Sequence, residues 1–334
     1  MINFKFKDVG QGDSILIEWT KDNINHYGII DCNLYNNKNP ILNEVIDKKI
    51  KYLDFVVISH LHYDHYSGFA DLFEHFINEN IKIGIFFHTF NTEYFRIFSS
   101  ILVTQKQWGV TNRFLNAFDK AEKKGLIKTI EVISPGLYPV NLTGSINLSF
   151  LSPNGKDYKD FAFQQARYLA KQTNTPPDFN NLSSIIQISD SIKTVLLTSD
   201  APQKSFKRII SVIQKKVQLV QVPHHGSLKN LLPSFWQPLK IKSNCPAIFS
   251  VGDVKKDKLP NRSVVEFFDN RGFYNESTNY VYGIAEYYAP SSMIPPKALS
   301  LSLSLSALSL KKSTTLKTIV PPTRFLGDRS HNLL

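Results

Sequence analysis

The chain has 334 residues, of which 42% are hydrophobic, enough for one large domain or two small ones with a sizeable core. Its 39 Lys and Arg residues against 28 acidic residues give a net charge of +11, which favours an anionic partner such as nucleic acid or simply promotes solubility. Two distant cysteines make no disulfide framework or thiolate zinc cluster, and no run of about 18 apolar residues occurs, so we expect a cytoplasmic protein without a membrane span.

Strands dominate the first half of the chain. Residues 1–8 alternate apolar and polar side chains, as a strand does and a signal peptide does not. We expect strands at 2–6, 14–19, 27–31, 55–58, 81–87, 127–133 and 147–151. We expect helices at 40–50, 69–76 and 92–124, the last broken at Gly109.

Strands alternate with helices in the second half. We expect helices at 161–171, 201–216 and 263–270, a hairpin formed by 184–189 and 194–198, and strands at 217–222, 247–251 and 280–286. This order predicts helices outside paired sheets in one domain, residues 1–288. Residues 289–334 are rich in Ser and Pro and alternate Leu with Ser at 299–306, which predicts a flexible low-complexity tail or one exposed strand.

Residues 59–68 read SHLHYDHYSG and directly follow the apolar run 55–58, which is typical of a buried strand. The segment holds four metal-capable side chains within six positions, which argues against an incidental polar loop: His60, His62, Asp64 and His65. In an extended chain His60 and His62 point the same way and can share one metal. Asp64 and His65 then face a second position, so the loop predicts two metal ions about 3.5–4 Å apart.

Two further clusters follow predicted strands. Asp200 follows the apolar run 195–197 and can bridge two cations or cap the helix expected at Ala201. His224 and His225 follow the strand at 217–222, and adjacent side chains of an extended chain point to opposite sides. We therefore expect one of these histidines to be a ligand and the other a neighbour.

Together these clusters resemble the metallo-β-lactamase superfamily of hydrolases, and most closely the hydrolase domain of the ComEC-type competence proteins. The segments that carry the resemblance span about residues 1–288: 8–14, 30–31, 59–68, 180–183, 197–200, 222–227 and 249–252. The resemblance implies an α+β fold, a four-layer αββα sandwich with its site at the edge of two sheets. It implies six ligands for two metals, with His60 and His62 at the first, Asp64, His65 and His225 at the second, and Asp200 between them.

The resemblance also implies roles for individual residues. Asp64 and His224 would be the catalytic residues, Asp64 by aiming a water molecule and His224 by contacting substrate or transferring a proton. Asp31 would orient a ligand from behind. The superfamily places another histidine on the first metal, and here either His88 or Asn181 would have to serve, which would leave the first site weaker than the second.

Two divalent cations would lower the pKa of a shared water from 15.7 towards about 7, giving hydroxide at neutral pH. Imidazole and carboxylate ligands suit Zn²⁺, and Mn²⁺ is a second choice. The basic composition, with lysines expected on the helix 201–216 and near 255–258 as an anion-binding rim or a solvated face, favours a phosphodiesterase or nuclease. The alternatives are a hydrolase of a small phosphoester, such as a cyclic nucleotide or a phosphorylated headgroup, and an inactive module that binds nucleic acid or a partner protein.

Overall fold

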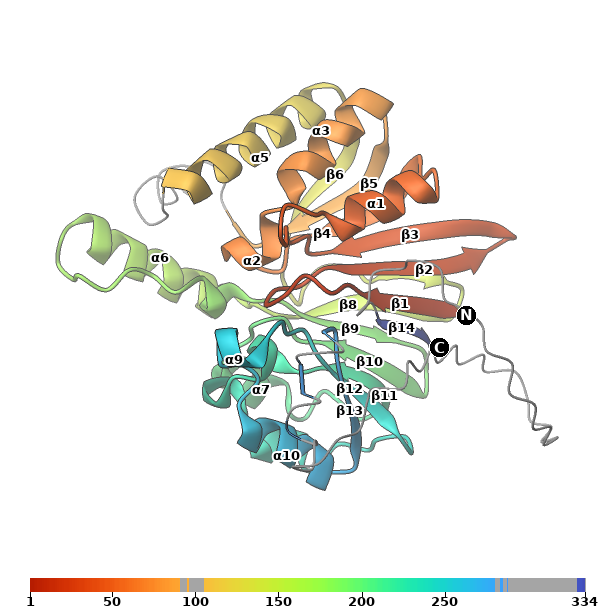
Figure 1. The fold of residues 1–334 in the computed structure, drawn as a ribbon, viewed down its shortest axis with the longest axis vertical. Coiled ribbons are helices and arrows are strands. Elements are labelled where there is room, and N and C mark those ends of the chain that lie inside the picture. Colours follow the sequence, from red (N-terminus) through yellow and green to blue (C-terminus); the bar gives the residue numbers. More distant parts are fainter. Residues whose placement is uncertain (91–94, 96–104, 280–282, 285–286, 288–328, 334) are drawn as a thin grey trace.

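Two β-sheets pack face to face, with helices on their outer surfaces (Figure 1). The computed structural model describes residues 1–90, 95, 105–279, 283–284, 287 and 329–333. In order across the first sheet, the described strands are β14 (Arg329–Leu333), β1 (Ile2–Phe6), β2 (Ile15–Lys21), β3 (Ile24–Ile30), β4 (Tyr52–Val57), β5 (Lys82–His88) and β6 (Ile127–Val132). Across the second sheet they are β13 (Phe273–Ser277), β12 (Cys245–Phe249), β11 (Lys216–Gln221), β10 (Lys193–Leu197), β9 (Ile185–Ser189), β8 (Ile146–Ser152) and β7 (Val140–Thr143).

Alternation along the strands builds three hydrophobic layers. In β4, Phe55 and Val57 face the second sheet, whereas Val56 packs under the helices of the first. The helices over the first sheet are α1 (Pro40–Asp47), α3 (Phe69–Glu79) and α5 (Gln105–Lys123). Those over the second are α7 (Gln203–Ile209), α8 (Pro233–Trp236) and α10 (Arg262–Asn270). The predicted four-layer αββα sandwich of the α+β class is therefore confirmed.

Parallel strand pairs bring several loops to one edge of the sandwich. β3 pairs with β4 in the first sheet, and β10 pairs with β11 and β11 with β12 in the second, all in parallel. Carboxyl ends of parallel strands emerge on the same side, which is where open sheets place their ligands. The loops that follow β3, β4, β10 and β11 carry Asp31, the 59–68 segment, Asp200 and the two adjacent histidines.

Several predicted boundaries differ from the structure. The helix expected at 161–171 is α6 (Gly155–Leu169), which begins earlier because Asn154 and Asp157 form a capping box. The helix expected at 201–216 ends at Ile209, and α5 continues through Gly109. β7 and β13 were not predicted, and most of the strand expected at 280–286 lies outside the described residues. No helix in the described part of the chain is both long and apolar enough to cross a bilayer.

The last residues of the chain form a strand, which differs from the prediction of a flexible tail over residues 289–334. β14 pairs antiparallel with β1, from Ile2 opposite Leu333 to Phe6 opposite Arg329. His331 is only 5% exposed, and its ring lies 6.3 Å from that of Phe6. Residues 329–333 thus belong to the first sheet, whereas residues 288–328 lie outside the described part and their flexibility stays a prediction.

Truncation tests where the domain ends. A chain ending at residue 288 would leave the β1 edge unpaired and expose Phe6, so we expect a melting temperature lower by about 4–8 °C, which corresponds to roughly 2 kcal/mol. A chain lacking only 291–325 keeps β14 and should melt within about 2 °C of the full chain, within the effect of shortening a loop. Equal melting temperatures for the full chain and the 288 truncation would show that β14 adds no stability.

Candidate metal centre

The loop after β4 is held against the turn that follows β1. The backbone N–H of Asp13 donates to the carbonyl of Asp64 over 3.1 Å. Gly12, at φ +139°, lies so close that a Cβ there would meet the same carbonyl at 2.5 Å. Tyr63–Tyr66 then forms the short helix α2, so the loop turns directly after His62. The glycine-rich turn therefore sets the path of the segment that carries the histidines.

The first group of candidate ligands is His60, His62 and Asp200. His60 Nε2 lies 3.2 Å from His62 Nδ1 and 3.8 Å from Asp200 Oδ2. Four ligand atoms that are about 2.0–2.2 Å from a tetrahedral ion lie roughly 3.3–3.6 Å apart. These separations are close to the edges of such a tetrahedron.

The second group is Asp64, His65 and His225. His225 Nε2 lies 3.4 Å from Asp64 Oδ2, and His65 Nε2 lies 3.9 Å from the same oxygen. Asp200 Oδ1 lies 3.5 Å from both His65 Nε2 and His225 Nε2. The two oxygens of Asp200 therefore face different groups, which is the arrangement of a carboxylate shared by two cations.

Three buried polar atoms in this cluster have no hydrogen-bond partner within the described part of the chain: His65 Nε2, Asp200 Oδ1 and His225 Nε2. His65 Nδ1 lies 2.9 Å from Asp31 Oδ2, and His225 Nδ1 lies 2.8 Å from the carbonyl of Ser250. Because each Nδ1 faces an acceptor, it carries a ring proton, and the lone pair that could ligate a metal is the one on Nε2. Burial lowers the pKa of both histidines, but the carboxylates 3.4–3.9 Å away raise it further, to about 9 for His225, so without a metal Nε2 holds a proton that a divalent cation would replace. The residues present fit a divalent metal.

The charges of the cluster agree with this fit. Burial alone would raise the pKa of Asp64, but His65 and His225 lower it to about 2. Asp200 is also buried, and His225 and His65 hold its pKa well below the usual value. Both carboxylates are therefore anions at neutral pH and available to a cation.

Asp31 holds the back of the site. Its Oδ1 accepts from the backbone N–H of Ser59 at 2.7 Å, and its Oδ2 accepts from the Ser59 hydroxyl at 2.6 Å. With His65 Nδ1, Asp31 therefore has three partners, and its side chain lies where the sequence resemblance implies. Ser199, at φ +44°, places its hydroxyl 2.7 Å from that of Ser59 and 3.2 Å from His60 Nδ1.

His224 and His225 do not lie on an extended chain, so the expectation that they point to opposite sides is wrong. Both adopt left-handed backbone angles, with φ of 48° and 54°, and Gly226 continues the turn at 84°. His224 Nε2 consequently lies 3.4 Å from Asp200 Oδ2, the oxygen that also faces His60. Both histidines thus reach the bridging carboxylate.

Asn230 is a contact of the candidate site that sequence reasoning missed. Its amide nitrogen donates to the carbonyls of Asp200 and Ala201, which leaves its Oδ1 to accept from His224 Nδ1 at 3.0 Å. His224 therefore presents its Nε2 lone pair to the site, and its side chain is 27% exposed, so a substrate can reach it. Nothing in the local sequence around Asn230 signals this role.

Other candidates lie elsewhere. His88 is not in any metal-competent group of the described residues, and its Nδ1 accepts from the backbone N–H of Phe90 instead. Asn181 lies in a 3₁₀ turn, Phe179–Leu182, and its role stays a prediction. Asp200 does not cap a helix, because α7 begins at Gln203 and its N-cap is Pro202. Asp13, which sequence reasoning gave no role, places Oδ2 3.5 Å from His65 Nδ1.

Comparison with known families agrees with this geometry. Residues 8–149 match the family model described as the Metallo-beta-lactamase superfamily, and no curated protein sequence matches the chain. The chain therefore contains a metallo-β-lactamase superfamily domain. The family model and the candidate ligand groups agree with a metal-dependent hydrolase of that superfamily.

Solved structures that resemble this chain differ widely from it in sequence. The metallo-β-lactamase fold protein YhfI from Bacillus subtilis is 14% identical, with a TM-score of 0.40 over 82% of this chain and 95% of that one. Zn²⁺-bound PqqB from Methylobacterium extorquens is 7% identical, with a TM-score of 0.41 over 78% and 84%. Tm1679, described as a metal-dependent hydrolase of the β-lactamase superfamily, is 11% identical, with a TM-score of 0.43 over 83% and 96%. Such distant likenesses establish no shared substrate.

Proposed function

We propose that this chain is a phosphodiesterase with zinc as its resident metal and nucleic acid as its substrate. The observation that carries the proposal is the shared carboxylate of Asp200, whose two oxygens face separate histidine groups at 3.4–3.8 Å. Paired metal sites of this kind suit in-line displacement at phosphorus. The net charge of +11 and the resemblance of the sequence motifs to ComEC-type hydrolase domains favour a nucleic-acid phosphodiester over a neutral lactam.

His60 and His62 would hold one metal, and Asp64, His65 and His225 would hold the other. Asp200 would contribute to both sites. When bound, the metals would supply Lewis-acid stabilisation of negative charge and a lower pKa for water. Asp64, ionised and 31% exposed, would accept a hydrogen bond from the attacking water and orient it.

The chemistry is a hydrolysis. The water oxygen forms a new bond to phosphorus, one ester P–O bond breaks, and the leaving alkoxide takes up a proton. His224 Nε2, a lone-pair site held by Asn230, would accept a proton from water or relay it to the leaving group. The products are a phosphomonoester and an alcohol.

A second candidate is hydrolysis of a small phosphodiester. It is favoured because cations that were expected to form a basic rim are paired with neighbours within the chain. Arg208 pairs with Asp157, and Lys204 Nζ lies 3.5 Å from the same side chain. Lys215 lies beyond α7 and donates to the Ser189 hydroxyl at 3.0 Å. These cations are held by neighbours within the chain, so less positive charge is available to a long polyanion.

An activity panel with a salt titration tests both candidates. We expect zinc-loaded protein to cleave single-stranded DNA, with KM rising about tenfold or more between 50 and 200 mM salt because bound counterions are released. Salt-insensitive cleavage of a small phosphodiester, with none of DNA, would select the second candidate. Cleavage of a lactam or carboxylic ester without any phosphodiesterase activity would reject both, and chelated protein is the control.

A further inference from the structure

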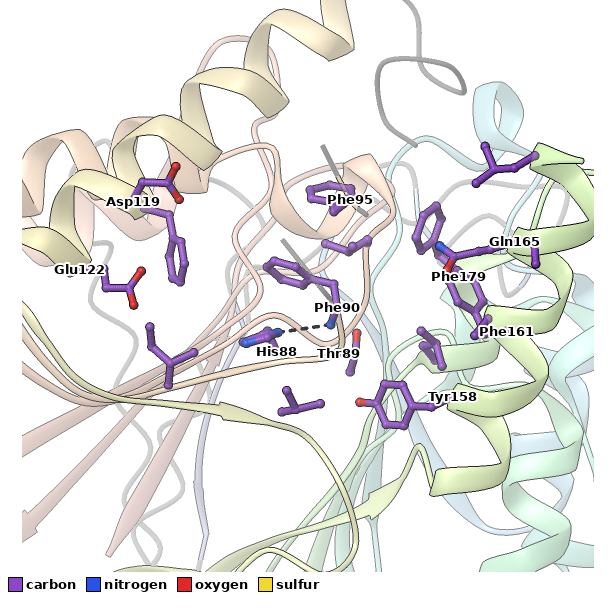
Figure 2. Close-up of a pocket in the computed structure, with 18 residues that line it drawn as sticks. His88, Thr89, Phe90, Phe95, Asp119, Glu122, Tyr158, Phe161, Gln165 and Phe179 are labelled. Carbon is purple, nitrogen blue, oxygen red and sulfur yellow. Dashed lines mark hydrogen bonds between the residues drawn. The ribbon is translucent and has the colours of Figure 1, made fainter. Parts of the chain in front are cut away.

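A cavity of about 680 Å³ lies beside the metal centre and has no part in the chemistry derived above (Figure 2). Its walls come from β5, β6, α5, α6 and the turn Phe179–Leu182. Ring side chains share the lining: Phe90, Phe95, Phe118, Tyr158, Phe161 and Phe179. This size is within the range of about 300–1,000 Å³ typical of small-molecule sites.

The cavity adjoins the metal centre. Leu61, which lines it, stands between His60 and His62 in the chain. Phe179 also lines it, and its ring meets that of His62 edge-on with centroids 6.1 Å apart. This proximity allows one molecule to place a group in the cavity and its reacting atom at the metals.

Polar atoms in the wall decide what kind of group fits. Thr89 is 1% exposed, and its hydroxyl has no hydrogen-bond partner among the described residues. His88 accepts from the Phe90 N–H through Nδ1, so its other nitrogen, Nε2, carries a proton and is a donor. Gln165 adds an amide from α6 (Figure 2). An aliphatic chain would leave such groups unpaired at a cost of roughly 1–3 kcal/mol each, whereas a heteroaromatic ring stacks on phenyl rings and pairs with them.

Charge excludes a second phosphate from the cavity. Asp119 and Glu122 of α5 line it, and both are acidic (Figure 2). Burial lowers the pKa of His88 to about 4, so His88 adds no positive charge at neutral pH. An anionic group is therefore disfavoured in the cavity, and the phosphate of a bound substrate lies outside it.

We propose that this cavity binds one uncharged, planar heteroaromatic ring of the nucleobase type, attached to the phosphodiester that is hydrolysed at the metal centre. The inference rests on the proposed phosphodiesterase function and adds a substrate class to it. It accommodates a nucleotide at the end of a single strand and a small nucleotide ester alike, because only one ring enters.

Substrates that share a leaving group test the proposal. We expect kcat/KM for thymidine 5′-(4-nitrophenyl phosphate) to exceed that for methyl 4-nitrophenyl phosphate by about tenfold or more, the value of one stacked base. Octyl 4-nitrophenyl phosphate should gain less than the thymidine ester. Equal rates for the methyl and thymidine esters, or a preference for the octyl ester, would overturn the subsite while leaving the phosphodiesterase function intact.

Variants on α6 place the effect in the cavity. Ala166 lines the cavity yet is exposed, so Ala166→Trp fills it without disturbing the core and should reduce the thymidine-to-methyl ratio about tenfold. Gln164→Trp, exposed on the same helix but outside the cavity, is the matched control and should keep the ratio. Equal ratios in both variants would place the base elsewhere.

Binding without turnover separates this inference from the proposed function. By calorimetry, uncleavable thymidine should bind the zinc-loaded protein, and Thr89→Val should weaken that binding about 2–10-fold while leaving the melting temperature unchanged or higher. Thymidine binding in a protein that cleaves no phosphodiester would uphold the cavity and reject the phosphodiesterase. Cleavage of the methyl ester without thymidine binding would do the reverse.

Discussion

Replacing Asp200 by Asn should abolish two-metal binding. The change keeps the shape of the side chain but removes the charge that faces His60 and His224 through one oxygen and His65 and His225 through the other. An amide nitrogen in either position cannot ligate a cation. We expect zinc content after loading to fall from two equivalents to one or none, as measured by elemental analysis.

The same variant should lose phosphodiester turnover by about a thousandfold or more, because metal ions supply several kcal/mol of transition-state stabilisation. Asp22→Asn is the matched control, since it makes the same chemical change at an exposed residue in the turn between β2 and β3. Circular dichroism checks that both variants fold. Two equivalents of zinc and full turnover in Asp200→Asn would contradict the shared-carboxylate arrangement.

Replacing Asp31 by Ala should both destabilise the fold and loosen the metal. The side chain is 1% exposed and accepts from Ser59 N–H, Ser59 hydroxyl and His65 Nδ1 at 2.6–2.9 Å. Leaving three buried donors without an acceptor costs about 3 kcal/mol or more, a fall in melting temperature of roughly 6–12 °C. Because His65 also loses the partner that fixes its ring, zinc affinity should fall about 10–100-fold.

The Asp31→Asn variant separates positioning of His65 from simple stability. Asn tolerates the left-handed φ of 58° and can still accept from Ser59, so part of the stability should return. Its amide N–H₂ cannot accept from His65 Nδ1, so the zinc affinity should stay low. Zinc affinity that recovers together with the melting temperature would indicate that Asp31 is only structural. Zinc titration and thermal unfolding on the same samples decide between these outcomes.

Much of the site could be predicted because buried strands can be recognised in the sequence as short runs of apolar residues. The apolar run 55–58 and the run 195–197 anchor the first histidine segment and Asp200, and both runs are buried strands. Histidines and carboxylates directly after such runs predicted the residues that the structure brings together. The order of strands and helices predicted helices outside paired sheets, whereas the four-layer αββα sandwich was implied by the family resemblance.

Other features escaped prediction for physical reasons. β14 exists only as a partner of β1, more than 300 positions away, so no local pattern marks it. The turn at His224 and His225 depends on left-handed backbone angles that non-glycine residues rarely adopt, so an extended chain was the natural but wrong expectation. His88 was a candidate ligand because it ends a strand, yet its ring lies in the wall of the cavity and pairs with Phe90.

The sequence by itself determined which side chains can ligate a metal and which strands hold them, because residue type and apolar periodicity are local properties. Only the tertiary structure decided that both oxygens of Asp200 are shared and that Asn230 orients His224, because these contacts depend on strand pairing and turn geometry. The cavity beside Leu61 is likewise a product of packing, since its walls come from segments between residues 61 and 182 that meet only when β5, β6, α5 and α6 are in place. Distances of a few ångströms between residues more than a hundred positions apart are set by the whole fold and by no single segment.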